Sequence, residues 1–312
     1  MEKRSTIRNE YEGKEFLIEN ERGRHSMKVY EIFSGVTFIF HEAHIQSIYF
    51  KERKNTSDEV IEITHCREGR LECHIGDEYC YMEPGDLAIA RTNSVSGETY
   101  FPLRHYHGVT IQIDLNVAPK SLVDVMADVD FEPKKIADKF CSKKGGSITR
   151  ANASIEHIFS EIYTVPKEIR KAYFKVKGFE LFLFLSVLEI EEEIQKERVY
   201  TQSQVEFAKK ISQYMLEHME EKITLEQLEE VFHVSSTYIK NAFKGVYGVS
   251  IAAYIRALKM ESAAYMLEYS NKSIIEIANL HGYENGSKFS GAFRAVKGVN
   301  PAEYRKNIGK QS

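Results

Sequence analysis

The sequence predicts an α+β protein, with a sheet-rich N-terminal part joined through helices to an all-α C-terminal part. Short segments rich in β-branched and aromatic residues follow one another between residues 28 and 115. Residues 152–195 carry the apolar periodicity of helices. The last third contains a supersecondary unit repeated at an offset of about 50 residues. We therefore expect three regions, residues 1–150, 151–202 and 203–312.

Composition and charge narrow the class of protein. The 312 residues are 28% charged and 43% hydrophobic, which is typical of a globular chain and too apolar for a disordered one. The most apolar stretch, FELFLFLSVLEI, is too short for a bilayer, and no apolar run follows the N-terminus MEKRSTIRNEYEGKEF. Four cysteines do not form a disulfide framework. We expect a cytoplasmic protein with no membrane partner.

Charge is distributed unevenly along the chain. Residues 1–202 carry 28 basic and 34 acidic side chains, whereas residues 203–312 carry 14 and 12. A positive balance in the C-terminal region suits a module that meets a polyanion.

The repeat in the last third predicts two pairs of short helices. GVSIAAYI (Gly248–Ile255) matches GVNPAEYR (Gly298–Arg305) at an offset of 50, and NAFK matches GAFR at the same offset. LEQLEEVFHV matches IIEIANLHGY further upstream. Each copy has the pattern of two helices joined by a tight turn, which is a helix-turn-helix unit.

The second copy has the more typical pattern. Ser273 is a suitable N-cap, and Gly282 permits a positive φ in the turn. A helix over residues 286–295 buries Phe289 and Phe293. Its outward side chains are Ser287, Lys288, Ser290, Gly291 and Arg294.

In the first copy, Leu225, Leu228 and Val231 form the apolar stripe of the leading helix. Ser235 or Ser236 caps the next helix, which buries Ile239 and Phe243. Glu229 and His233 stand where the second copy has Ala278 and Gly282. The outward side chains are Thr237, Lys240, Asn241 and Lys244.

A single helix over residues 250–270, with Ser250 as N-cap, connects the two copies. About twenty helical residues span roughly 30 Å. Successive major-groove faces on one side of B-DNA lie roughly 34 Å apart. One chain can therefore place the second helices of both copies on the same side of a duplex.

Residues 203–312 resemble the DNA-binding domain of the AraC/XylS family of transcription regulators. The strings that carry the resemblance are SIIEIANLHGYENGSKFSGAFRAVKGVNPAEYR and YIRALKMESAAYML. The resemblance implies a regulator, not an enzyme, that binds double-stranded DNA at promoter sites, acts with RNA polymerase and is usually an activator. It implies that residues 236–244 and 286–294 enter successive major grooves. The DNA-binding residues carried over are Ser236, Thr237, Lys240, Asn241, Lys244, Ser287, Lys288, Ser290, Gly291 and Arg294.

Within that set, the base-edge positions fall on Thr237, Lys240 and Asn241 of the first copy. In the second copy they fall on Ser287, Lys288 and Gly291, and Gly291 departs from the long polar residue common in the family. The basic residues expected to neutralise phosphates are Lys244, Lys259, Arg294 and Lys297.

The N-terminal region predicts a jelly-roll barrel. Gly76–Asp77 fits a two-residue hairpin loop, which places Cys73 opposite Cys80 on the neighbouring strand. The Pro84–Asp86 turn resembles the small cupin-like barrels with which AraC-type regulators sense effectors. The predicted strands are Val36–Phe40, Val60–Cys66, Arg70–Ile75, Glu78–Met82, Asp86–Ala90 and Gly108–Asp114.

The alternative hypothesis is that this barrel binds a metal ion, as a cupin-type metal-binding sensor or metalloenzyme does. His105 and His107 occupy alternate strand positions, so both imidazoles share a face. A metal needs a third and a fourth ligand, and the sequence shows no well-placed carboxylate. We therefore expect no metal site and no cofactor. Cys66, Cys73 and Cys80 are expected to be buried thiols.

The strings HCREGRLECHIG, YMEPGDLAI and YFPLRHYHGVTIQID resemble the sensor half of regulators that respond to the siderophore pyochelin. The resemblance implies a small-molecule, siderophore-like effector. Cationic and aromatic side chains suit an anionic or aromatic ligand, and they equally suit the rim of a barrel. The candidate effector-binding residues are Arg91, Arg104, His105, Tyr106 and His107.

Two helices are expected between these regions, over residues 152–163 and 166–195. The second contains more apolar residues than a lone surface helix needs, among them Phe174, Phe182 and Leu185. They either pack on the barrel or pair with a second subunit. The resemblance to AraC-type regulators implies the second arrangement, a homodimer. Residues 197–203 are the expected hinge.

Overall fold

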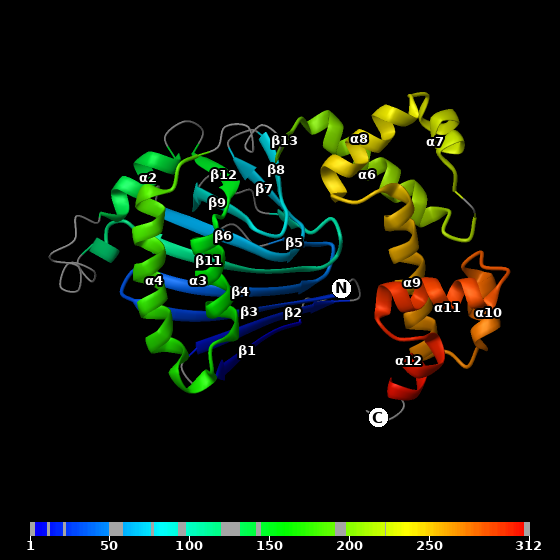
Figure 1. The fold of residues 1–312 in the computed structure, drawn as a ribbon, viewed down its shortest axis with the longest axis horizontal. Coiled ribbons are helices and arrows are strands. Elements are labelled where there is room, and N and C mark those ends of the chain that lie inside the picture. The colour runs from blue at the N-terminus through cyan, green and yellow to red at the C-terminus, as the bar shows by residue number, and fades with distance from the viewer. Residues whose placement is uncertain are drawn as a thin grey trace. The chain divides into compact units, whose positions relative to one another are not determined.

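The chain forms two compact units, here called the N-terminal unit (Met1–Gln202) and the C-terminal unit (Ser203–Ser312) (Figure 1). They are seen in a computed structural model that describes residues 4–10, 13–20, 23–49, 59–75, 78–92, 98–119, 132–141, 145–190, 198–221 and 223–308. Each unit is described by itself below.

The N-terminal unit is built on two antiparallel sheets. The larger has the strand order β1-β2-β3-β4-β11-β6-β9-β12 and the smaller the order β13-β8-β7-β10-β5. The strands of the larger sheet are β1 (Arg4–Glu10), β2 (Gly13–Asn20), β3 (Gly23–Phe33), β4 (Val36–His44), β6 (Val60–Gly69), β9 (Asp86–Arg91), β11 (Tyr106–Asp114) and β12 (Gly146–Arg150). Those of the smaller sheet are β5 (Ser47–Tyr49), β7 (Leu71–Ile75), β8 (Glu78–Met82), β10 (Glu98–Tyr100) and β13 (Val199–Tyr200).

The predicted closed barrel is wrong for the described part of the chain. The larger sheet ends at β1 on one edge and β12 on the other, and these two strands are not paired with each other. One face of this sheet packs on the smaller sheet through a core that includes Ala43, Cys66 and Tyr106. The other face packs on helices.

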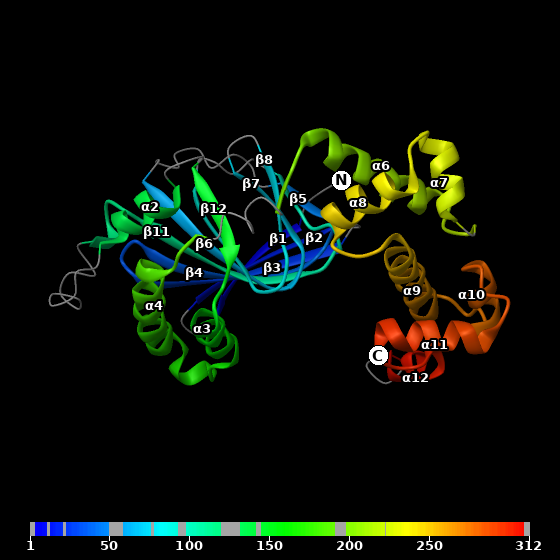
Figure 2. The same ribbon diagram turned by 45° about the horizontal axis from the view of Figure 1, so that its top comes forward.

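Three helices supply the second core: α2 (Pro133–Cys141), α3 (Ala153–Thr164) and α4 (Arg170–Val187), the last preceded by a 3-10 turn. Figure 2 shows α3 and α4 side by side below the large sheet. Asn152 caps α3 by accepting a hydrogen bond from the Ile155 backbone. Phe174, Phe182 and Leu185 of α4 are fully buried in the core with sheet residues such as Phe38. These apolar side chains therefore pack on the sheet.

The hairpin of β7 and β8 has the predicted register. Cys73 lies opposite Cys80, and Ile75 opposite Glu78, while the predicted loop itself, Gly76–Asp77, lies outside the described residues. All four cysteines are free thiols. The strands β1, β2 and most of β3 were not predicted, because segments such as RSTIRNE lack a run of apolar residues at alternate positions.

The expected hinge at residues 197–203 is largely ordered where it is described. Val199 and Tyr200 pair with β8. Arg198 forms ion pairs with Glu83 and Asp86, at the turn between β8 and β9. The chain is thus anchored to the N-terminal unit up to Tyr200, and the predicted extension of α4 beyond residue 190 lies outside the described residues.

The described residues of the C-terminal unit form helices joined by turns. The helices are α6 (Gln202–Glu217), which begins one residue before the unit, α7 (Leu225–Phe232), α8 (Ser236–Tyr247), α9 (Ile251–Tyr269), α10 (Ile274–Leu280), α11 (Gly286–Lys297) and α12 (Pro301–Ile308). The long helix α9 connects the pair α7–α8 to the pair α10–α11, as the sequence repeat predicts (Figure 2). Among the described residues, no helix combines the length and the apolar character needed to span a bilayer.

Candidate functional site

The first helix pair begins with a capping box. The Thr224 side chain accepts from the Gln227 backbone, and the Gln227 side chain accepts from the Thr224 backbone, so two of the unsatisfied N–H groups of α7 are paired. Ser235 then caps α8 by accepting from Tyr238 N–H. Glu229 of α7 accepts from the Ser236 backbone. The glutamate that distinguishes this copy therefore joins the two helices across their turn.

Helix α8 buries one face and exposes another. Ile239, Ala242 and Phe243 are buried, with the side chains of Val246 and Tyr247. Side chains at i, i+3, i+4 and i+7 share a helix face, and this exposed face carries Thr237, Lys240, Asn241 and Lys244, with Ser236 half-buried beside them. The aromatic core holds a polar, positively charged stripe toward solvent.

The second helix pair repeats this construction. Ser273 and Glu276 form the capping box of α10. Asn285 caps α11 by accepting from the backbones of Ser287 and Lys288, and Phe289 and Phe293 are fully buried. The exposed residues on the outer side of α11 are Ser287, Lys288, Gly291 and Arg294, with Ser290 half-buried.

The outer side of α11 is bare at its centre. A Cβ atom added at Gly286 or Gly291 would meet nothing within 4 Å. Neither glycine is needed for packing or for backbone conformation, so the surface between Lys288 and Arg294 is open to a ligand that approaches closely. Long side chains of α11 are confined to the positions around this gap.

Helix α9 is fixed at its middle by a buried lysine. Lys259, predicted to neutralise phosphate, is 8% exposed. Its Nζ donates to the carbonyl oxygens of Glu221 and His281, each at 3.1 Å. Burial lowers the pKa of this amine. Lys259 is therefore a structural residue, and Lys297, another predicted phosphate ligand, forms an ion pair with Glu261 at 2.5 Å.

The two interhelical turns share a left-handed residue. Gly282 has φ of 76° and His233 has φ of 55°. A side chain at positive φ costs about 1–2 kcal/mol. We expect Gly282→Ala to lower the free energy of unfolding by about that amount, and His233→Gly to raise it by up to about 1 kcal/mol. Urea denaturation followed by circular dichroism measures both changes, and shifts of the same sign would contradict the shared geometry.

Comparison with known proteins identifies the family to which this helical unit is similar. A family model described as a helix-turn-helix domain matches residues 228–307. The Transposon Tn10 TetD protein of Escherichia coli is 31% identical over 93 residues, which are 30% of this chain and 67% of that protein. The chain belongs to the AraC family of transcription regulators. The matched region, residues 228–307, is the helix-turn-helix domain of that family.

Two further proteins are similar to about a third of this chain. The uncharacterized HTH-type transcriptional regulator YisR of Bacillus subtilis is 31% identical over 100 residues, or 32% of this chain and 35% of YisR. The chain spans well under half the length of this relative. The C-terminal domain of AraT, a response regulator from Geobacillus stearothermophilus, matches with 32% identity and a TM-score of 0.32, covering 32% of this chain and 84% of that one.

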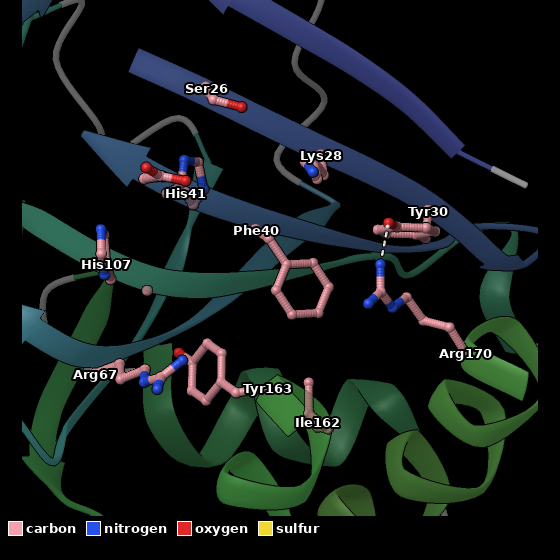
Figure 3. Close-up of a pocket in the computed structure, with 12 residues that line it drawn as sticks. Ser26, Lys28, Tyr30, Phe40, His41, Arg67, His107, Ile162, Tyr163 and Arg170 are labelled. Carbon is pink, nitrogen blue, oxygen red and sulfur yellow. Dashed lines mark hydrogen bonds between the residues drawn. The ribbon is translucent and has the colours of Figure 1, made fainter. Parts of the chain in front are cut away.

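The N-terminal unit contains a cavity of about 310 Å³ between the large sheet and the helices α3 and α4 (Figure 3). Arg170 donates to the Tyr30 hydroxyl at 3.1 Å at one end. At the other end the Arg67 guanidinium lies 4.7 Å from the centre of the Tyr163 ring. The lining residues are Ser26, Lys28, Tyr30, Phe40, His41, Glu42, Arg67, His107, Gly108, Ile162, Tyr163 and Arg170.

The predicted effector residues are brought together only in part. His107 lines the cavity, whereas Tyr106 points to the opposite face, into the core between the sheets. Arg104 is exposed and Arg91 half-buried, and neither lines the cavity. His105 lies beside His107 and His44, in a group able to hold a metal ion. Sequence reasoning missed Arg67, Arg170 and Tyr163, because nothing local links them across 100 residues of chain.

Proposed function

We propose that this AraC-type chain regulates transcription by placing α8 and α11 in successive major grooves of one duplex. The observation that carries the proposal is the repeated construction of the two helices, each with buried aromatic residues beneath an exposed polar and basic stripe. Helix α9 has 19 residues and spans roughly 28 Å. That length is close to the roughly 34 Å between major grooves on one side of a duplex.

In this proposal the residues of α8 and α11 divide into two roles. Thr237, Lys240 and Asn241 face the base edges from α8, and Asn and Lys side chains suit adenine and guanine in the major groove. Lys244 and Arg294 follow one helical turn later and neutralise phosphates. With Gly291 lacking a side chain, α11 positions the protein on the backbone more than it reads bases.

The test is a competition experiment with the full chain. A labelled duplex from the chain's own upstream region is bound at about 0.15 M salt and competed with random duplexes. We expect specific binding at least on the order of 1,000-fold tighter than binding to random DNA. Equal competition by random duplexes, with and without candidate effectors, would contradict the proposal.

We propose further that the cavity binds a small anionic, aromatic effector and that the bound state activates transcription. Three cations, Lys28, Arg67 and Arg170, line the cavity together with one carboxylate, that of Glu42. Phe40 lies between the aromatic rings of Tyr30 and Tyr163, with centroid distances of 5.8 Å and 6.2 Å. The wall therefore offers cations for a carboxylate and ring faces for an aromatic group.

A panel of aromatic carboxylates tests the effector proposal. We expect at least one to raise the melting temperature of the chain, and Arg170→Ala to weaken its binding about 10- to 100-fold, because a charge-assisted hydrogen bond is lost. Lys167→Ala is the matched control, since Lys167 is exposed near the start of α4 and does not line the cavity. An unchanged affinity in Arg170→Ala would exclude this cavity.

We propose a homodimer that forms through α4. Although Phe174 and Phe182 of this helix are buried against the sheet, its other face is open. Val176, Leu183 and Val187 are 61%, 43% and 72% exposed. Spacings of seven and four residues put them on one helix face, as in a helix–helix seam. Sedimentation velocity should show a dimer that Leu183→Glu dissociates, and a monomeric wild type would refute the dimer.

We place the regulator in the cytoplasm, with its DNA and RNA polymerase, and assign it no enzymatic activity.

A further inference from the structure

Histidines from two neighbouring strands of the large sheet meet at one end of that sheet. His107 of β11 lies opposite Glu42 of β4 on one side and opposite Glu68 of β6 on the other. Alternate residues of a strand share a face. His44, two residues after Glu42, and His105, two residues before His107, therefore join the same group.

A β-bulge turns the carboxylate into this group. The pairing of β11 with β6 shifts between His107 and Gly108, which pair with Glu68 and Cys66, so Arg67 is the extra residue. A bulge re-aims the side chains next to it. Arg67 covers the Tyr163 ring while Glu68 Oε2 lies 3.3 Å from His107 Nδ1 and 3.5 Å from His105 Nε2.

The three imidazoles are close enough to share one ion. One ligand atom from each of His44, His105 and His107 lies within 4.8 Å of the others. Their ring centroids are 4.7 to 5.6 Å apart. A tetrahedral ion with metal–nitrogen bonds of about 2.0–2.1 Å needs nitrogen atoms about 3.4 Å apart. Small rotations of side chains that are 28–40% exposed bring the nitrogens to that separation.

His107 has two ring nitrogens, and its Nδ1 lies beside Glu68. Its Nε2 is buried and has no hydrogen-bond partner. Buried polar atoms are nearly always paired, so an unpartnered nitrogen within a group of ligands points to a missing partner.

We propose that His44, His105 and His107 bind a divalent transition-metal ion of the Zn²⁺ class. Three imidazoles are ligands that Zn²⁺ and its neighbours in the first transition row accept, and the fourth position is left to water or to the Glu68 carboxylate, which lies beside His105 and His107. The site is on the face of the sheet that packs on the helices, since Tyr106 points the other way, into the core between the sheets. Because His107 also lines the cavity, the ion adjoins the proposed effector site.

No metal site was expected from the sequence, because neither His44 nor Glu68 could be placed beside His105 and His107 without the structure. His44 is distant in sequence from the other two histidines, and only the pairing of β4 with β11 brings it near. Glu68 reaches the group through the bulge. Neither the cross-strand register nor the bulge can be read from His105-Tyr106-His107 alone.

Metal titration of the full chain tests the site without DNA. Chelator-treated protein is titrated with Co²⁺, followed by the visible d–d absorption of a four-coordinate ion, and then with Zn²⁺ in competition. We expect one saturable site, displaced by Zn²⁺. His107→Ala and His44→Ala should each weaken Co²⁺ binding by on the order of 10- to 100-fold or more.

His157→Ala is the matched control, because His157 is 69% exposed on α3 and pairs with Glu161; it should leave the titration unchanged. His44→Ala removes a partly exposed side chain, so its circular dichroism should match that of wild type. No saturable site, or equal Co²⁺ affinity in wild type and the His44→Ala/His107→Ala double variant, would overturn the proposal and show a hydrogen-bonded cluster instead. Either result leaves the DNA-binding proposal to its own test.

Discussion

Replacing Asp86 with alanine lowers the free energy of unfolding of the N-terminal unit by about 3–5 kcal/mol, as expected when one partner of a buried ion pair is removed. The Asp86 side chain is fully buried. Its carboxylate pairs with Arg150 at 3.2 Å and Arg198 at 2.9 Å, and accepts from the Glu83 backbone at 2.9 Å. Alanine leaves two guanidinium groups without this partner.

Chemical denaturation measures this loss. Glu31→Ala is the control, because Glu31 is exposed on β3 and should change stability by less than about 0.5 kcal/mol. Asp86→Asn keeps an acceptor and should fall between the two. A loss in Asp86→Ala no larger than in Glu31→Ala would contradict the role assigned to the buried carboxylate.

The same carboxylate connects the sheet to the segment that leads into the C-terminal unit. Asp86 follows Gly85, whose φ of 88° makes the tight turn after Pro84. Arg198 immediately precedes β13. Loss of Asp86 is therefore expected to release the segment around Arg198, and limited proteolysis near residue 198 should detect the release.

Substituting both Lys240 and Asn241 with alanine weakens binding to the cognate site by about 2–6 kcal/mol, because each lost base contact costs about 1–3 kcal/mol. Both side chains are exposed on α8 and neither contributes to its buried face. Fluorescence anisotropy with cognate and random duplexes measures the change. Cognate binding should fall far more than random binding.

Two controls make this result specific. Lys306→Ala removes one exposed positive charge on α12. It should leave binding to the cognate and random duplexes unchanged or weaken both equally. Lys244→Ala, at a proposed phosphate contact, should weaken binding to both duplexes equally and reduce the salt dependence of binding by about one ion. An unchanged preference for the cognate duplex in the Lys240→Ala/Asn241→Ala variant would refute the assignment of base readout.

The C-terminal unit was predictable because its determinants are local. Ser235, Ser250 and Ser273 are the N-caps that the sequence indicates. The spacing of Phe289 and Phe293 shows which face of α11 is buried. The positive φ at Gly282 follows from its place after the apolar stripe. Each feature involves residues within one or two helical turns.

The N-terminal unit was less predictable because its determinants are distant in sequence. Arg170 reaches Tyr30 across 140 residues, and His44 reaches His105 through strand pairing. The buried Lys259 shows the same difficulty within the helical unit. A lysine on a helix is usually solvated, and only the two carbonyl groups of Glu221 and His281 explain its burial.

The measurement closest to the central claim is a hydroxyl-radical footprint of the full chain on its own upstream region. If α8 and α11 bind in successive major grooves, each bound chain should protect two stretches of the DNA backbone (windows) about 10 base pairs apart. Lys240→Ala/Asn241→Ala should remove protection in one window, and Arg294→Ala should weaken it in the other. Protection of one window only, or loss of both windows together in each variant, would contradict the account.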